Sequence, residues 1–216
     1  MRRRTLLGGL ACYPVIAFAQ SVSESPDLSR YTAGPLPSEW QTGWRTGSGA
    51  LGRWSVVEDR STSSGRAIEQ SDPDATDHRF PLAVFQPQLV TDVNATLRSK
   101  AVPGKGDRAG GLAVRLLDAD NYYVVRANAL EDNVNLYRMV KGRRQEIKGA
   151  SAKVTSGESH LLSLRAQGPS LTVSFDGKML FTVDDRTFMG PGRVALWTKA
   201  DSVTRFDNLK TVSLLA

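Results

Sequence analysis

Three carboxylates and one of the chain's two histidines lie together between residues 72 and 79, in the segment Asp72-Pro-Asp74-Ala-Thr-Asp77-His78-Arg79. A histidine beside carboxylates is suited to act as a general base, and clustered oxygen ligands suit a hard divalent cation such as calcium. The segment lacks the glycine and the ligand spacing of a known calcium loop, so an ordinary acidic turn is the alternative that we favour. We take His78, Asp74 and Asp77 as candidate catalytic residues.

A second group of candidates follows from the alternation of residues along predicted strands, since neighbouring residues point to opposite faces of a sheet. The core-facing set is apolar: Leu112, Val114, Leu116, Tyr123, Val125, Ala127, Val134, Leu136, Val194 and Leu196. The alternate positions are polar and aromatic, and they give the candidate substrate-binding residues Arg115, Tyr122, Arg126, Asn128, Asn135, Tyr137, Arg193, Trp197 and Lys199. Aromatic planes stack on sugar rings and Arg and Asn bond to hydroxyls, so this face suits carbohydrate. A solvated outer face with cross-strand pairs explains the same pattern equally well.

Short alternating runs separated by Gly, Asp and Asn predict an all-β protein, a sandwich of two antiparallel sheets. The predicted strands are Arg53–Glu58, Phe80–Gln86, Val90–Arg98, Leu112–Leu117, Tyr122–Ala129, Asn133–Val140, His160–Ala166, Leu171–Phe175, Met179–Val183, Arg193–Thr198 and Val203–Val212. Asp176-Gly177 predicts a two-residue hairpin turn. The other histidine, His160, shares the parity of Leu162 and Leu164, which favours a structural role in the core.

Several segments resemble the 3-keto-disaccharide hydrolase domain family, formerly domain of unknown function 1080. They are Asp118–Arg126, Asn135–Arg144, Phe175–Lys178, Gly192–Ser202 and Phe206–Asn208, and the resemblance extends from about Trp54 to Val212. It implies a concanavalin A-like jelly-roll β-sandwich whose candidate face is concave. It further implies a hydrolase or lyase of 3-keto glycosides, in which a cation polarises the keto oxygen. Similar carbohydrate-binding jelly rolls hold a cation with an acid of the last strand, here Asp207.

Other enzyme signatures are missing from the sequence. Retaining glycosidases of the jelly-roll class resemble one another in a Glu-x-Asp-x-x-Glu strand, which places a nucleophile and an acid on one face. The nearest fragment here, Glu131-Asp132, lies at a predicted turn and has no second glutamate downstream on the strand. No Gly-x-Ser-x-Gly elbow, His-Glu-x-x-His motif or phosphate-binding loop is present.

The N-terminus predicts export. Three arginines precede an apolar stretch from Leu6 to Ala19 that is too short to cross a bilayer, and Ala17-Phe-Ala19 forms a small-x-small cleavage site. We interpret residues 1–19 as a signal peptide, 20–39 as an N-terminal arm rich in Ser and Pro, and 40–216 as the jelly-roll domain. The arginine pair resembles a twin-arginine motif, with the ordinary secretory route as the alternative and a lipoprotein at Cys12 disfavoured. A periplasmic or secreted protein without an integral membrane segment in its mature chain is expected.

The formal net charge of +6 does not indicate a nucleic-acid partner, because three of the arginines belong to the predicted signal peptide. Lys141, Arg143 and Arg144 form the one basic cluster, at a predicted hairpin tip. Three hypotheses remain: a glycan-binding domain, which we favour; an enzyme acting on 3-keto-disaccharides; and an envelope protein that binds another protein through a sheet edge.

Overall fold

The computed structural model describes residues 21–102 and 106–215. The predicted signal peptide, with its arginines and Cys12, lies outside the described residues. None of the helical segments in the described part of the chain is long and apolar enough to span a membrane.

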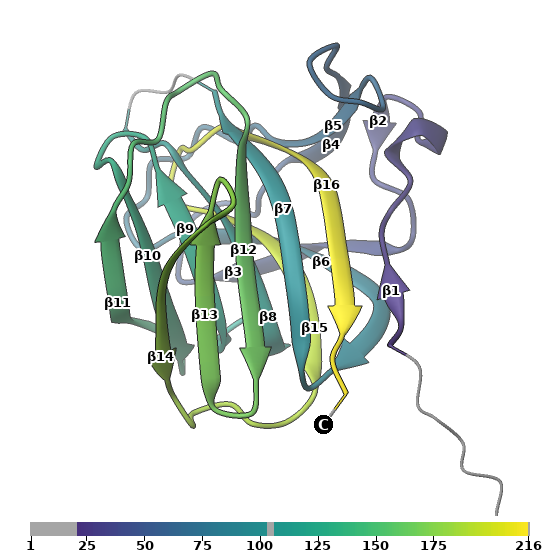
Figure 1. Ribbon diagram of the computed structural model, residues 1–216. Helices are drawn as coiled ribbons and strands as arrows, with labels where there is room; N and C mark the ends of the chain where they lie inside the picture. Colours follow the sequence, from purple (N-terminus) through teal and green to yellow (C-terminus); the bar gives the residue numbers. More distant parts are fainter. Residues whose placement is uncertain (1–20, 103–105, 216) are drawn as a thin grey trace, which may run out of the picture.

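The described residues form two antiparallel β-sheets that pack face to face (Figure 1). The strands of sheet A, in spatial order, are β14 (Lys178–Asp184), β13 (Ser170–Phe175), β12 (His160–Gln167), β7 (Val93–Ala101), β16 (Thr204–Ser213), β5 (Arg66–Gln70), β4 (Trp54–Glu58) and β2 (Gly34–Pro35), with β1 (Ser23–Glu24) also paired to β16. Those of sheet B are β11 (Arg143–Ser151), β10 (Asn133–Val140), β9 (Asn121–Asn128), β8 (Ala109–Asp118), β15 (Gly192–Thr198), β6 (Phe80–Val90) and β3 (Trp40–Thr46). The jelly-roll β-sandwich expected from the sequence is confirmed.

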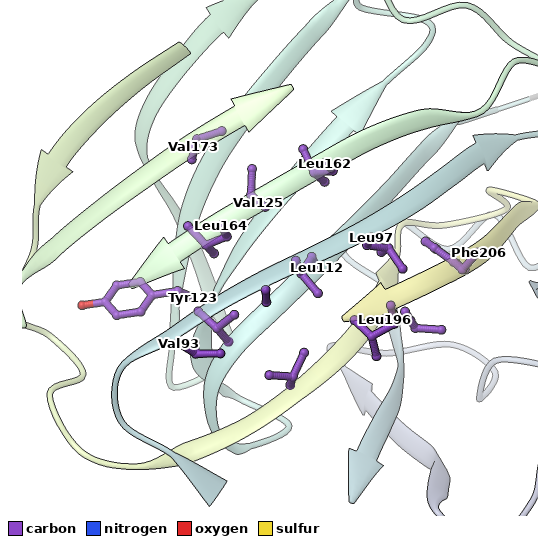
Figure 2. Packing of buried hydrophobic residues seen from close by; sticks show 14 of the residues in the cluster. Val93, Leu97, Leu112, Tyr123, Val125, Leu162, Leu164, Val173, Leu196 and Phe206 are labelled. Atoms are coloured by element: carbon purple, nitrogen blue, oxygen red, sulfur yellow. The ribbon is translucent and has the colours of Figure 1, made fainter. Parts of the chain in front are cut away.

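The core lies between the sheets and is built from alternate residues of both. Figure 2 shows Leu97, Leu162 and Leu164 of sheet A facing Leu112, Val125 and Leu196 of sheet B. All six side chains are fully buried. The large apolar area removed from water here is the main stabilising contribution in a chain whose predicted mature part contains no cysteine.

The segment predicted as an N-terminal arm is packed against the sandwich. Its residues supply β1 and β2, which pair with β16 and β4, and a single 3₁₀ turn, η1 (Leu28–Arg30). Leu28 is buried in the main core, and Asp27 caps the turn by accepting the backbone N–H of Ser29. Residues 21–39 are therefore part of the folded domain.

The Asp176-Gly177 turn forms as predicted, because both residues adopt the positive φ angles (47° and 78°) that a primed hairpin turn requires. The Asp176 carboxylate accepts from the Leu161 backbone N–H and contacts His160 Nδ1 at 2.7 Å. His160 Nε2 in turn accepts the Thr155 N–H, and the ring stacks on Phe175. His160 thus holds a loop and a hairpin together in the structural role expected of it.

Candidate functional site on the concave face

The predicted binding residues depend on which side chains share the outer face of sheet B, the face turned away from sheet A. Strand register aligns a row of residues across that face: Asn135, Arg126, Gly111, Trp197, Leu82 and Trp44. The row runs from β10 to β3. Arg126, Asn135 and Trp197 therefore lie on one face of sheet B, as the alternation along their strands predicted.

This face is concave, because residues from distant strands meet across it. The hydroxyl groups of Thr46 on β3 and Tyr122 on β9 lie 2.7 Å apart. The Arg144 guanidinium of β11 lies 4.9 Å from the ring centre of Phe80 on β6 and 4.7 Å from that of Tyr137 on β10. In a flat sheet β6 and β10 would be roughly 19 Å apart. Twist and curvature thus close the sheet over its own outer face, called the concave face below.

The aromatic floor of the concave face is sealed by this closure. Trp197 and Tyr122 are fully buried, and Phe80 is 1% exposed. Phe80 stacks on Trp197 at 5.2 Å, and Trp197 Nε1 donates to the Tyr122 hydroxyl at 3.2 Å. The expectation that Trp197 and Tyr122 contact a ligand directly does not fit their burial, since both form a second apolar core that supports the face.

Gly111 allows this floor to pack. A Cβ at position 111 would lie 3.2 Å from the Trp197 ring, 3.3 Å from Arg126 Cβ and only 2.6 Å from the Val125 carbonyl oxygen. The absence of a side chain therefore lets the tryptophan ring lie beside Arg126, next to the polar part of the face.

The polar part begins with a buried hydrogen-bond network around Arg126. One Arg126 nitrogen, Nη1, donates to Asn133 Oδ1 at 2.8 Å, and the other, Nη2, donates to Glu131 at 2.7 Å and to the Tyr137 hydroxyl at 3.0 Å. Asn135 Nδ2 donates to the same hydroxyl at 3.1 Å and to Glu146 at 3.0 Å. Arg126, Asn135 and Tyr137 are each less than a tenth exposed. Each is therefore held in one orientation by its neighbours.

A second pair of contacts continues the network beyond Arg126. Asn128 Nδ2 donates to Asp107 Oδ1 at 3.0 Å, and Lys199 Nζ lies 2.6 Å from Asp107 Oδ2. Asn128 and Asp107 are buried, whereas the Lys199 side chain is 22% exposed and that of Glu131 is 48% exposed. Solvent and a ligand can therefore reach the cluster from its rim.

We call this set the concave polar cluster: Arg126, Asn128, Asn135, Tyr137 and Lys199, which the sequence predicted, with Asp107, Glu131, Arg144 and Glu146, which it did not assign to a site. The cluster contains three carboxylates and three cations, so its formal charges cancel. Burial alone would raise the pKa of Glu131, but hydrogen bonds from Arg126 and Asn133 outweigh it and lower that pKa. A surface of mixed donors and acceptors without net charge is suited to a polyhydroxylated ligand.

Two predicted binding residues lie elsewhere. β8 is irregular after Val114, and Arg115 adopts a positive φ of 48°, so the alternation changes. Arg115 instead donates to the carbonyl groups of Thr91, Gly168 and Phe188 and pairs with Asp92 at 2.9 Å. Its side chain is fully buried, which removes it from the binding face.

Arg193 is on the same side of β15 as Trp197 and Lys199, but six residues before Lys199. At ~3.3 Å per residue this places it roughly 20 Å from the concave polar cluster along the strand. Its backbone pairs with that of Leu116. Arg193 is therefore separate from the other candidates.

The acidic loop divides into a structural part and an exposed part. Arg79 is fully buried, and its guanidinium donates to the carbonyl groups of Ala50, Asp74 and Ala200 and to the Asp72 carboxylate. The Asp74 carboxylate accepts from the backbone N–H groups of Ala50 and Thr76 and from the Thr76 hydroxyl, which lowers its pKa to about 2. Asp74 thus serves as a turn-forming acceptor, the alternative favoured from the sequence.

His78 and Asp77 form the exposed part. His78 Nε2 lies 3.4 Å from Asp77 Oδ2, and both side chains are about three-quarters exposed, at 74% and 76%. The His78 ring also meets the edge of Phe80, 6.3 Å between centres, so the pair lies at the rim of the concave face. A hydrogen bond from the His78 backbone N–H, with the histidine charge, lowers the pKa of Asp77.

The described residues contain no group of three or more His, Cys, Asp or Glu side chains placed to hold a metal ion. Asp207 is buried, and its burial raises its pKa. The carboxylate of Asp59 nearby is held by Lys100, Ser61 and Arg205. Asp207, at which the sequence analysis expected a divalent cation, is thus not part of such a group among the described residues.

Comparison with known proteins finds similar solved structures. No family model and no curated protein matches the chain. Carbohydrate-binding module CBM66 from Bacillus subtilis superposes with a TM-score of 0.65 and 18% identity, over 80% of this chain and 94% of that one. A β-glucanase from Bacillus licheniformis superposes with a TM-score of 0.59 and 13% identity, over 90% of this chain and 98% of that one. The exoplasmic/lumenal domain of VIP36, in a Ca²⁺/Man-bound form, superposes with a TM-score of 0.52 and 13% identity, over 82% of this chain and 84% of that one. These similarities define the fold as a concanavalin A-like jelly roll, shared with a carbohydrate-binding module, a glucanase and the VIP36 domain.

Proposed function

We propose that this protein is an exported carbohydrate-binding domain that holds a glycan at the concave polar cluster. The observation that carries the proposal is the network in which buried Arg126, Asn135 and Tyr137 orient one another while Lys199 and Glu131 stay within reach of solvent. Oriented donors and acceptors give directional recognition of hydroxyl groups without an ordering cost on binding. The fold shared with a carbohydrate-binding module supports the same proposal.

The sealed floor determines how a sugar is bound. Because Trp197 and Phe80 are covered, the ligand meets the rim of the cluster and not a bare tryptophan plane. We expect binding dominated by hydrogen bonds to Lys199, Glu131, Glu146 and the Tyr137 hydroxyl. Affinity electrophoresis in gels that contain single soluble polysaccharides tests this directly. Retardation by at least one polysaccharide is expected, and free migration in every gel would contradict the proposal.

An enzyme acting on 3-keto glycosides is the second candidate, and the observation that favours it is the exposed His78–Asp77 pair beside Phe80. His78 would accept the proton adjacent to the keto group, and Asp77 would orient its ring. Asp74 has no such role in this version, since its carboxylate is taken up by the turn. Release of 3-ketoglucose or glucose from a 3-keto-disaccharide, assayed with and without a chelator, tests the activity. Turnover lost in His78→Ala with an unchanged thermal melt would support it, and full activity in that variant would refute the role of His78.

A further inference from the structure

Arg144 is the cation of the concave polar cluster that lacks a partner. Arg126 is paired with Glu131, and Lys199 with Asp107. The Arg144 guanidinium rests on the faces of Phe80 and Tyr137, and within the described ranges it forms neither an ion pair nor a hydrogen bond. Its Nη1 atom is buried without an acceptor. Stacking uses the face of a guanidinium and leaves the N–H groups at its edge free to donate.

The Tyr137 hydroxyl beside it is also restricted to donating. Its oxygen already accepts from Arg126 Nη2 at 3.0 Å and from Asn135 Nδ2 at 3.1 Å. A phenolic oxygen has two acceptor sites and one hydrogen, so only the hydrogen remains for a ligand. Among the described residues no acceptor takes that hydrogen. Two neighbouring groups, Arg144 and Tyr137, thus offer donors alone.

Glu146 lies two residues beyond Arg144 along β11, on the same strand face. Its carboxylate accepts from Asn135 and is not paired with Arg144. Asp77, at the rim of the concave face, is a carboxylate whose charge interacts with that of Arg144. Neither acid neutralises the guanidinium by direct contact in the described structure.

We propose that the glycan group held at Arg144 and Tyr137 is a carboxylate, so that the protein selects sugars of the uronic acid class. This inference rests on the proposed glycan-binding function and specifies its ligand. A planar carboxylate accepts two parallel N–H bonds from a guanidinium and leaves a lone pair for the tyrosine hydrogen. A neutral hydroxyl at the same place would meet donors only and would neutralise no charge. Glu146 limits the affinity by repelling the same group.

The test compares binding of purified protein to three polysaccharides that contain uronic acids (polygalacturonate, alginate and hyaluronan) with binding to fully methyl-esterified pectin, dextran and dextran sulfate. The protein should bind at least one of the three acidic polysaccharides tenfold or more tightly than it binds the neutral glycans, methyl-esterified pectin and dextran. Its affinity for that polysaccharide should fall as the salt concentration rises. Binding of a neutral glycan alone would overturn the inference and leave the proposed function intact. Stronger binding of dextran sulfate would overturn the assignment to a carboxylate. Failure to bind any glycan would instead contradict the proposed function itself.

Four variants locate the effect. Arg144→Ala should weaken polyuronate binding tenfold or more, whereas its exposed neighbour Arg143→Ala should change it less than twofold. Glu146→Gln should strengthen it a few-fold by removing the repulsion. If Arg144→Ala lowers the melting temperature, Arg144→Lys keeps a charge but loses the planar fork, and its affinity should lie between those of the wild type and the alanine variant. Equal affinities across the wild type and all these variants would overturn the role of Arg144.

Discussion

Trp197 Nε1 donates to the Tyr122 hydroxyl at 3.2 Å, and the same hydroxyl contacts Thr46 at 2.7 Å. This buried junction joins β15, β9 and β3, three strands that are not neighbours in sheet B. It holds the concave face closed over its aromatic floor. The junction also separates residues that stabilise the face from residues that a ligand can reach.

Trp197→Ala should therefore act on stability. Removal of a fully buried indole that stacks on Phe80 leaves a cavity, and such a substitution costs about 3–5 kcal/mol of unfolding free energy. Urea unfolding followed by circular dichroism measures the loss. A decrease below ~1 kcal/mol would mean that the floor is not packed as described.

Tyr137→Phe should weaken glycan binding with only a small effect on stability. The ring and its contacts with Arg144 remain, but the single hydrogen that the hydroxyl offers is lost. We expect roughly a tenfold lower affinity, with a stability loss of about 1 kcal/mol from the missing acceptor. Tyr123→Phe is the matched control, because its hydroxyl donates to Asp185 away from the concave face. Similar loss of binding in both variants would argue against a direct role for Tyr137.

Arg115→Gln should lower the free energy of unfolding without altering the binding face. Its guanidinium satisfies three carbonyl groups and pairs with Asp92, so the variant leaves the three carbonyl acceptors without their donor and the Asp92 carboxylate, 14% exposed, without its cation. A loss of about 3 kcal/mol or more is expected in chemical denaturation. Glycan affinity of the folded fraction should match the wild type, and a selective loss of affinity would return Arg115 to the site.

The acidic loop should make stability depend on pH through Asp74. The folded-state pKa of Asp74 is about 2, below its ordinary value of 3.8, because backbone N–H groups of Ala50 and Thr76 favour the charged form. Its contribution is therefore fully present above pH 3.8 and is lost as the pH falls toward 2.

Asp74→Asn should lower the melting temperature at neutral pH and flatten the acid limb of the stability profile. Thermal melts at a series of pH values compare it with the wild type. Parallel profiles for the two proteins would show that Asp74 does not carry this dependence. A glycan affinity unchanged at neutral pH is also expected, since Asp74 faces the turn.

Much of the fold was predictable because its strands alternate cleanly. β10 and β13 lie within a residue of their predicted bounds, and Leu112, Val125 and Leu196 occupy the core as expected. β11 was missed because it is an edge strand with little burial, so its sequence has few apolar residues to reveal a period of two. Arg144 and Glu146 escaped assignment for the same reason.

The limits of prediction at the site have physical causes too. Alternation places Arg126, Asn135 and Tyr137 on the outer face of sheet B, as the strand register does, but it fails for Arg115, because one irregular residue in β8 reverses the faces. Burial of Trp197 depends on contacts between distant strands, which no local pattern encodes. The role of Asp107 likewise arises from tertiary contacts, since it precedes β8 in a loop and is fixed by Asn128 and Lys199.

The most direct test of the central claim is to map the glycan on the protein by amide chemical-shift changes during titration with a polysaccharide that retards it. If the glycan binds at the concave polar cluster, the changes concentrate at Arg126–Tyr137, Arg144–Glu146 and Lys199. The outer face of sheet A should stay unchanged, and Thr172 and Thr182, whose hydroxyls bond to each other there, report on it. Shifts confined to sheet A or to the segment around Leu28, with an unperturbed concave polar cluster, would contradict glycan binding at that cluster.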